Sequence, residues 1–509
     1  MNERLPRSLL LSGLVSLVIY AGYNQWPELI ATLTGRHPSV FSSTSVLWWL
    51  LWCTYLPAVL WVARTPPTNA AGDRRALLFV LLLAVLFRLV LLPGDPDLSS
   101  DYHRYLWDGR VFSGGVNPYA LAPNAPALAP FRYDALHMQL NRPDVIGVYP
   151  PLSQWVFAVL ASLRPDALGL KLTFLVFEAL GVFALLALLR REGRPLAQSA
   201  VYLWNPLIVI EITRGGHSDP LMLPFFLLAL VFRLEGRRGA AGIALGLATL
   251  ARIYPMVILP ALMQRAGPGR RGIAGFDPRL PLAFLATLVV GYAPFVVMDG
   301  GLWGHLPIRL GADYEEFNAG VRTALRYLLA WVAGFDDPWR FAKSAGRILL
   351  AGYLIFTVRV LFKGETAGSV SRRAMALLGG WLLFVMPAVE PWYAWGLVAL
   401  SAVTLSPAWI WFSGAAGFSY LKFAAPSGLV PAWVLLMEYF PTLALLARSA
   451  GGSTGVPPAE EPEKDEAWPR PLPPGDQTWT RVPFYIVGVL PILAALLVLY
   501  FFFVGFVGH

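Results

Sequence analysis

Long apolar runs separated by short polar clusters make up most of the chain. The first three runs cover 8–23, 46–63 and 76–92, and similar runs recur up to residue 504. Runs of this kind are typical of helices that span a membrane. The pattern predicts an all-α polytopic integral membrane protein with about thirteen or fourteen transmembrane helices.

The composition supports this class. Hydrophobic residues make up 56% of the 509 residues and charged residues 14%, with a mean hydropathy of +0.57. A soluble domain has about 25% charged residues. The net charge of +9 comes from Lys and Arg between apolar runs, so it indicates membrane topology and a lipid bilayer, with no nucleic acid as partner. The single cysteine, Cys53, excludes a disulfide framework.

The basic clusters predict how the chain is oriented. Arg64 and the cluster at 73–75 lie between the second and third runs, which places that loop in the cytoplasm. Arg4 and Arg7 precede the first run, which is expected to be a retained signal anchor. Three crossings then place Asp101 on the outer face, in a long loop with one or two interfacial helices.

For residues 152–194, the apolar runs and the positive charges predict different topologies. Two apolar runs, 152–163 and 168–189, are followed by a basic cluster at 190–194 that favours the cytoplasm. If both runs crossed fully, this cluster would lie outside. Either one run, the short first one, is re-entrant or tilted, or the charge rule fails here.

The first long polar interruption, residues 99–119, combines acids, bases and aromatic groups beside the membrane. Its candidates are Asp101, His103, Arg104, Trp107, Asp108 and Arg110. Ionisable groups are costly there, so their presence indicates chemistry at a membrane surface. The alternative is an ordinary amphipathic interfacial helix with an N-cap and an i,i+4 ion pair.

Further polar clusters follow. Residues 211–219 contain Glu211, Arg214, His217 and Asp219 around two glycines, and the alternative is a surface turn. Arg252 and Tyr254 interrupt an apolar run at a kink or a meeting of half-helices, where Arg252 binds a lipid phosphate or snorkels. The loop 299–326 is predicted to be largely solvated. Glu390 and Trp392, at 387–393, belong to an aromatic belt or to the wall of a sugar site.

Some chemistry finds no support. The chain has no GxxxxGK loop and no HExxH motif, so nucleotide hydrolysis and zinc proteolysis are not indicated. Asp101 and His103 could hold a divalent cation, but two ligands without a third leave the metal unknown and no cofactor certain.

Five motifs in order resemble a known family. They are DYHRYLWDGRVFSGGVNPYALAP, VYPPLSQ, LWNPLIVIEITRGGHSD, RIYPMVILP and EPWYAW, from about residue 99 to 395. Together they resemble bacterial polyprenyl-phosphate-sugar-dependent glycosyltransferases of the GT-C superfamily, mannosyltransferase-like members related to the catalytic subunit of GPI mannosyltransferase I. The resemblance implies a GT-C-like many-helix fold with its active site at the extracytoplasmic face of the bacterial inner membrane.

The resemblance also implies substrates and roles. The donor would be a polyprenyl-phosphate-linked hexose, commonly mannose, and the acceptor a glycan, glycolipid or protein. The early acid maps onto Asp101, the expected general base of an inverting transfer, whereas the family's second neighbouring acid is replaced by Tyr102 and His103. The expected sugar- or acceptor-binding residues are His103, Asp108, Tyr149, Asp219, Glu390 and Trp392. The expected phosphate-binding residues are Arg214, His217, Arg252 and Tyr254.

Alternatives of another class are a transporter or flippase of lipid-linked saccharides without transferase activity, and a scaffold subunit. A transporter is expected to line its charges through the membrane midplane. The predicted organisation is given by ranges: N-terminal helices at 1–93, the first outer loop at 94–150, the transmembrane body at 151–447, a Pro/Glu-rich linker at 448–482 and a final helix at 483–509.

Overall fold

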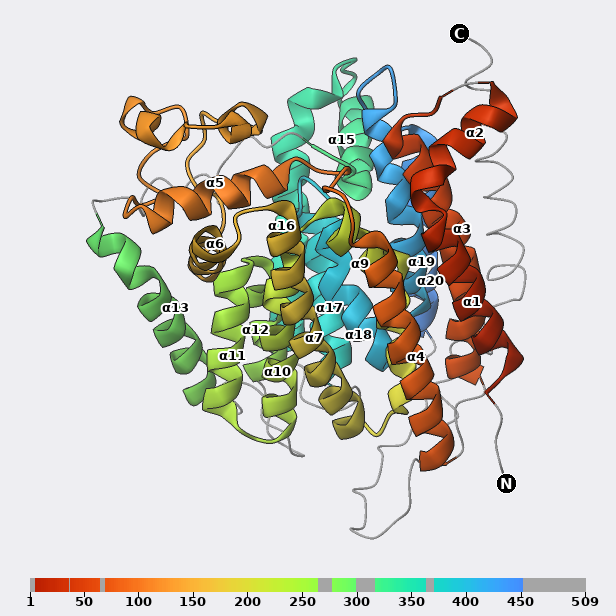
Figure 1. Ribbon diagram of the computed structural model, residues 1–509. Helices are drawn as coiled ribbons and strands as arrows, with labels where there is room; N and C mark the ends of the chain where they lie inside the picture. The colour runs from red at the N-terminus through yellow and green to blue at the C-terminus, as the bar shows by residue number, and fades with distance from the viewer. Residues whose placement is uncertain are drawn as a thin grey trace. The chain divides into compact units, whose positions relative to one another are not determined.

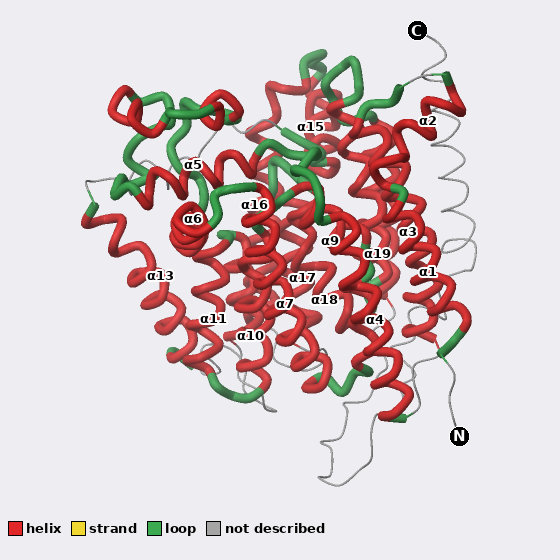
Figure 2. Tube along the Cα trace, in the orientation of Figure 1, coloured by secondary structure: helices red, strands yellow, loops and turns green. Residues whose placement is uncertain are grey.

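The computed structural model describes residues 5–35, 37–64, 69–263, 277–298, 316–362 and 370–451. Within these ranges the chain forms helices, turns and loops, with one isolated bridge between Phe317 and Ala388 and no strand (Figure 2). The predicted all-α class is confirmed. The predicted linker beyond 451, the last helix at 483–509 and residues 299–315 of the loop 299–326 lie outside the described residues.

Several described helices are long and apolar enough to cross a membrane. Four satisfy the length and hydropathy expected of a span: α3 (Val40–Arg64), α7 (Ala167–Arg191), α13 (Arg279–Val297) and Pro338–Phe362, which includes α16 (Ala342–Phe362). The stretches Pro206–Gly215 and Asp219–Leu234 form a fifth candidate, bent by 118°. The chain is a multi-pass membrane protein. The total of thirteen or fourteen helices stays a prediction.

The described residues of 1–91, 192–210 and 397–451 form one compact unit. Its elements are α1 (Arg7–Ala21), η1 (Tyr23–Gln25), α2 (Trp26–Thr34), α3, α4 (Ala70–Leu91), η4 (Leu196–Ser199), α8 (Ala200–Leu203), α9 (Pro206–Ile210), most of α18 (Trp395–Thr404), α19 (Pro407–Ala415), η12 (Ala416–Phe423) and α20 (Ala432–Gly451). Indole rings form part of its core, with Trp49 stacked on Trp52 at 4.8 Å and Trp411 edge-on to both.

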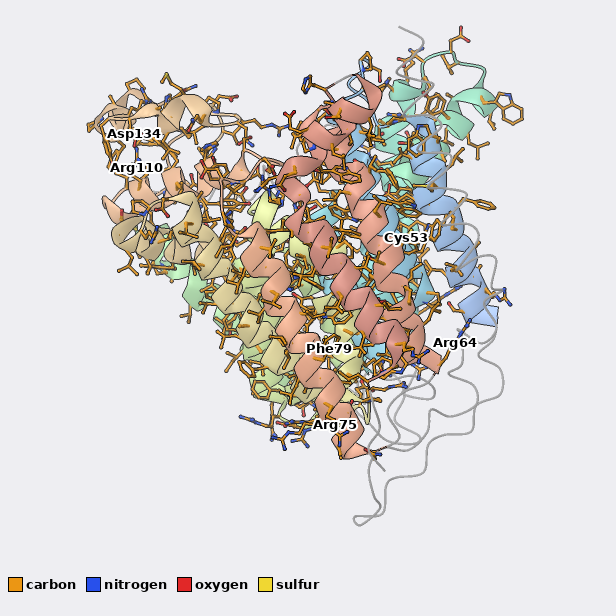
Figure 3. The ribbon with its side chains drawn as sticks, turned by 45° about the vertical axis from the view of Figure 1, so that its right-hand side comes forward. Cys53, Arg64, Arg75, Phe79, Arg110 and Asp134 are labelled. Atoms are coloured by element: carbon orange, nitrogen blue, oxygen red, sulfur yellow. The ribbon has the colours of Figure 1, made fainter. Side chains whose placement is uncertain are left out.

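Arg64 and Arg75 lie at the same end of α3 and α4, as Figure 3 shows. Cys53 lies midway along α3 in the same view. The two basic positions therefore flank one connection, as the charge pattern predicts for the loop between the second and third runs.

The second compact unit contains the described residues of 92–191 and 211–396. Its elements are α5 (Asp101–Ser113), η2 (Pro126–Phe131), η3 (Ala135–Gln139), α6 (Pro151–Leu163), α7, η5 (Glu211–Gly215), η6 (Asp219–Met222), α10 (Leu223–Leu234), α11 (Arg238–Ala251), η7 (Tyr254–Ile258), α12 (Leu259–Met263), α13, α15 (Gly320–Ala333), η9 (Pro338–Phe341), α16, α17 (Val370–Gly380), η10 (Trp381–Val385) and η11 (Pro391–Ala394). The division of the chain into five predicted ranges stays a proposal.

Helices α5 and α6 run across the direction of their neighbours in this unit. In Figure 1, α6 is seen end-on and α5 lies crosswise, whereas α7, α10 and α11 run up and down. Helix α5 begins after Ser100 and has an acid in its first turn and an arginine in its last, which suits the helix dipole. Prolines at 150 and 151 begin α6, because proline is tolerated in a first turn. This orientation favours an interfacial α5, and a run at 152–163 that does not cross fully.

The chain breaks its helical path at Arg252. Helix α11 ends at Ala251, Arg252 is extended with φ −144° and ψ 135°, and the 3-10 helix η7 begins at Tyr254. The predicted interruption of the apolar run is thereby confirmed. Because the backbone leaves the helix here, the side chains of Arg252 and Tyr254 can point to a common place.

Candidate active site

Asp101 lies in the first turn of α5, and its side chain is partly exposed. Its Oδ1 accepts a hydrogen bond of 2.7 Å from Nδ2 of Asn141, and its Oδ2 accepts one of 3.3 Å from the hydroxyl of Tyr149. Both donors are neutral, so they orient the carboxylate without neutralising it. The carboxylate is therefore held in place and can still accept a proton.

Tyr149, which donates to this carboxylate, lies two residues before the start of α6. Its buried ring packs edge-on against Tyr105 at 4.8 Å, and Tyr105 stacks on Phe157 at 4.8 Å. Burial raises the pKa of Tyr149 well above its usual range, and the negative charge of Asp101 adds to the rise. The phenol therefore keeps its proton at neutral pH and remains a donor to Asp101.

Arg252 is a buried cation that contacts Tyr149 and Asp219. It forms an ion pair with Asp219, and Tyr254 donates a hydrogen bond of 3.1 Å to the other oxygen of that carboxylate. The guanidinium carbon of Arg252 lies 5.5 Å from the centroid of the Tyr149 ring, within the range of a cation–π contact. Tyr149 thus connects Asp101 to Arg252, Asp219 and Tyr254.

The Asp219 carboxylate reaches this position through a turn at Gly216. Gly216 has φ +64°, which glycine adopts without strain. The helical path ends with the π-helix η5 and resumes with η6, whose N-cap, Ser218, makes no side-chain cap bond. Asp219 is fully buried and paired with Arg252, so this polar cluster is not a surface turn.

His217 forms a second group of contacts, which an aromatic chain joins to the first. Its Nδ1 lies 2.7 Å from Oε2 of Glu211, and its ring stacks on Trp392 with centroids 3.6 Å apart. Trp392 and Tyr393 are 6.0 Å apart, and Tyr393 and Tyr254 are 6.2 Å apart. Elements from 211–219, 252–258 and 391–394 therefore meet in one site.

Arg214 holds the segment that leads into α5. Its guanidinium pairs with the carboxylate of Asp97 and donates a hydrogen bond of 3.3 Å to the carbonyl oxygen of Pro93. Its own carbonyl oxygen accepts a bond of 2.9 Å from the Asp97 amide. These contacts position the start of α5, and the phosphate-binding role of Arg214 stays a prediction.

Lys171, on α7, also binds the segment that leads into α5. Its Nζ donates to the carbonyl oxygens of Leu92, Gly94 and Thr213 at 2.6, 2.6 and 3.2 Å. An ammonium that satisfies three carbonyls fastens the segment before α5 to the π-helix. The sequence analysis did not single out Lys171, which lies inside an apolar run.

Replacing Lys171 with methionine is expected to destabilise this unit by about 2–3 kcal/mol, because buried carbonyl oxygens lose their donor. The check is thermal unfolding of the purified protein in detergent, with Lys343→Met, a change of an exposed lysine on α16, as the control. Equal melting temperatures for the two variants would contradict the anchoring role.

Asp108 is tied into the support of α5. Asp108 is buried. One of its carboxylate oxygens accepts a hydrogen bond of 2.7 Å from Nε of Arg104, and the other accepts one of 3.1 Å from Nε2 of Gln154. Arg104 also donates 2.8 Å to the carbonyl oxygen of Val145. The expected i,i+4 pair is confirmed, and a sugar-binding role for Asp108 stays a prediction.

His103 and Glu390 lie at the edges of the site. His103 is partly exposed, and burial lowers its pKa, so its imidazole is neutral near pH 7. Glu390 precedes η11 and is partly buried. Two backbone hydrogen bonds to Phe317 hold the loop that carries Glu390. The Phe317 amide donates one of 3.2 Å to the carbonyl oxygen of Pro387, and the Phe317 carbonyl oxygen accepts one of 2.8 Å from the Val389 amide.

All the predicted site residues lie in the second compact unit, and they come from segments far apart in the chain. Sequence reasoning missed Asn141, Gln154 and Asp97 as partners, because no local pattern marks a residue whose role comes from a distant contact. Glu211 belongs to the predicted polar cluster at 211–219 but is not among the predicted binding residues. In the described part of the chain, no three His, Cys, Asp or Glu side chains are grouped to hold a metal ion.

Fold and site define an all-helical, multi-pass membrane protein with a carboxylate, a buried guanidinium and aromatic rings gathered at breaks in its helices. Residues 10–266 match the family model described as alpha-(1->6)-mannopyranosyltransferase, N-terminal domain. Because this match covers just over half of the 509 residues, the chain belongs to that family. The mannosyltransferase-like resemblance of its motifs is confirmed.

Three similar proteins have curated names. GPI mannosyltransferase 1 of Gibberella zeae is 33% identical over 129 residues, 24% of this chain and 29% of that protein. Alpha-(1->6)-mannopyranosyltransferase B of Corynebacterium glutamicum is 23% identical over 387 residues, 67% of this chain and 63% of that protein. Alpha-(1->6)-mannopyranosyltransferase A of the same organism is 24% identical over 366 residues, 64% of this chain and 72% of that protein. The chain spans less than two thirds of the length of the first two relatives.

Proposed function

We propose that this protein is a hexosyltransferase that moves a mannosyl group from a polyprenyl-phosphate donor to an acceptor hydroxyl, with inversion. The observation that carries the proposal is the partly exposed carboxylate of Asp101, which is oriented by Asn141 and by Tyr149, whose ring also contacts the buried guanidinium of Arg252. Family membership and the names of its relatives support mannose as the sugar.

Asp101 acts as the general base. An acceptor hydroxyl is a weak nucleophile, and a positioned carboxylate that takes its proton as the new bond forms accelerates the attack. The acceptor oxygen bonds to C1 of mannose while the bond from C1 to the phosphate oxygen breaks. The proton goes to Asp101, and the bonding electron pair leaves with the polyprenyl phosphate.

The leaving phosphate needs hydrogen-bond donors and positive charge rather than a proton. Arg252 is buried and pairs with Asp219 through one terminal nitrogen, while its Nε has no hydrogen-bond partner among the described residues. This free N–H suits a phosphate oxygen. Tyr254 holds the Asp219 carboxylate, and through it Arg252.

The sugar and acceptor contact the rim of the site. We assign to this rim the partly exposed His103 and Glu390, the face of Trp392 and the region around Tyr149, with Asp108 and Asp219 fixing their surroundings. The bond named in the relatives is alpha-(1->6), so the acceptor hydroxyl is assigned to C6 of a hexose. Because a direct displacement inverts C1, an alpha product requires a beta-linked donor.

The site is assigned to the extracytoplasmic face of the bacterial inner membrane. The charge pattern supports this orientation, because the basic positions at Arg64 and Arg75 favour the cytoplasm and α4 then leads the chain away from them before residue 101. The donor then reaches the site from the outer leaflet of the bilayer.

The direct test is transfer of radiolabelled mannose from a short polyprenyl-phosphate-mannose to a mannoside acceptor by the purified full-length protein. Transfer to the 6-hydroxyl is expected, with an alpha linkage in the product. A transporter would instead carry the labelled lipid across proteoliposomes without forming a product, and that result would overturn the proposal. Repeating the assay with a chelator decides whether a divalent cation is needed.

A further inference from the structure

We propose that Glu211 is a positioning residue for His217, and that the pair presents Nε2 of His217 to the phosphate group of the lipid-linked donor. This inference rests on the proposed function, because it names how the donor phosphate is bound in the same site. It assigns a role to Glu211, which the reaction described above does not use.

The contact between the two side chains is close and fully enclosed. Oε2 of Glu211 lies 2.7 Å from Nδ1 of His217, and both side chains have 0% exposure. The backbone repeats the connection, since the His217 amide donates 3.1 Å to the carbonyl oxygen of Glu211. The π-helix Glu211–Gly215 is followed by a turn at Gly216, with φ +64°, and the two together bring Glu211 and His217 into contact.

Two further contacts leave the imidazole a single orientation. Trp392 stacks on its ring at 3.6 Å with an interplanar angle of 19°. On another side, a Cβ at Gly215 would lie 2.4 Å from Nδ1 of His217 and 2.6 Å from Oε2 of Glu211. Any side chain at 215 would therefore push the pair apart.

The other ring nitrogen has no hydrogen-bond partner within the described ranges. Nε2 of His217 is buried and makes no hydrogen bond to any described residue. Buried polar atoms in proteins are nearly always hydrogen-bonded, so an orphaned one in a fixed ring points to a ligand group. It lies on the segment that carries Asp219, the partner of Arg252.

The surroundings of the ring select the chemistry of that ligand. When Nδ1 donates to Glu211, Nε2 can donate as well only in the imidazolium form. Glu211 provides the countercharge for this form, and the Trp392 face provides a cation–π contact. A phosphate oxygen is the anionic acceptor that matches such a donor, and the lipid phosphate is present both in the donor and in the released product.

The experiment is a double-mutant cycle on the full-length protein with Glu211→Gln, His217→Gln and both together. Glutamine keeps an oxygen acceptor for Nδ1–H but removes the charge, so a merely structural hydrogen bond would survive it. Transfer is expected to fall about 10–100-fold in each single variant, and the double variant is expected to be no worse than His217→Gln. The KM for the acceptor should not change.

A binding measurement separates this inference from the proposed function. Binding of a short polyprenyl phosphate, followed by calorimetry, is expected to weaken about tenfold in both single variants and not further in the double. Additive losses, or an effect on the acceptor KM alone, would overturn the inference while transfer persists. If the wild type binds the lipid phosphate but transfers no mannose, the proposed function fails and the binding role stands.

Controls address folding. Glu211→Asp keeps the charge on a shorter side chain and is expected to recover part of the lipid-phosphate binding lost in Glu211→Gln. Glu235→Gln, at the end of α10 where Glu235 pairs with Arg191 at 2.6 Å, should behave as the wild type. If Glu211→Gln does not fold, normal binding by His217→Gln would by itself overturn the inference.

Discussion

Asp101→Asn is expected to lower kcat for mannosyl transfer by about 10³-fold, because an amide cannot accept the proton of the acceptor hydroxyl. The fold should remain, since Asp101 is partly exposed and asparagine keeps one acceptor oxygen for Asn141, while its NH2 group can donate to the hydroxyl of Tyr149. The measurement is the rate of labelled mannose transfer at saturating donor, together with the melting temperature of the variant.

Asp134→Asn is the matched control for this change. Asp134 belongs to the same outer loop and pairs with Arg110 at 2.7 Å, as Figure 3 shows for the two labelled side chains. The Arg110 guanidinium lowers the pKa of the Asp134 carboxyl, but the Asp134 side chain is 42% exposed, so the pair contributes little to stability. Near-normal transfer by Asp134→Asn and full transfer by Asp101→Asn together would remove the general base from the mechanism.

Local patterns in the sequence predicted the parts of the site that depend on local physics. Asp101 begins α5 as the acid of its first turn, where a carboxylate suits the helix dipole, and its amide donates a hydrogen bond of 3.2 Å to the hydroxyl of Ser99. The break at Arg252 follows from a proline placed three residues later within an apolar run. Charge in a membrane protein is costly, so the polar clusters themselves marked where elements converge.

Partners far apart in the chain could not be predicted in this way. Nothing near Asp97 indicates that it pairs with Arg214, and no pattern around Asn141 indicates a contact with Asp101. The sequence therefore predicts Arg214 as a phosphate-binding residue, which stays a prediction, but gives no sign that its guanidinium also holds the segment before α5. A motif specifies residue types, and the tertiary fold decides which of them are already paired.

The orientation of a helix relative to its neighbours cannot be predicted from hydropathy either. The run at 152–163 is as apolar as a short span, and only its orientation across α7 separates it from one (Figure 1). The packing of Phe157 against Tyr105 explains that orientation, because it binds α6 to α5. The charge conflict at 190–194 was the one sequence signal that pointed to it.

Arg252→Gln is expected to have the second large effect, a loss of about 10²–10³-fold in kcat for transfer, because the developing phosphate charge loses its buried cation. The variant also leaves the carboxylate of Asp219 buried with Tyr254 as its known donor. Removing one partner of a buried ion pair costs about 3–5 kcal/mol, so the melting temperature should fall as well.

Asp219→Asn separates the two consequences. It leaves the guanidinium of Arg252 in the site but without its carboxylate, so stability should fall by a similar amount while binding of a short polyprenyl phosphate is retained. The double variant Asp219→Asn with Arg252→Gln should be more stable than either single one, because no charge is left unpaired. If Arg252→Gln binds the lipid phosphate as tightly as the wild type and only its stability is reduced, Arg252 supports the fold and is not the cation that receives the leaving group.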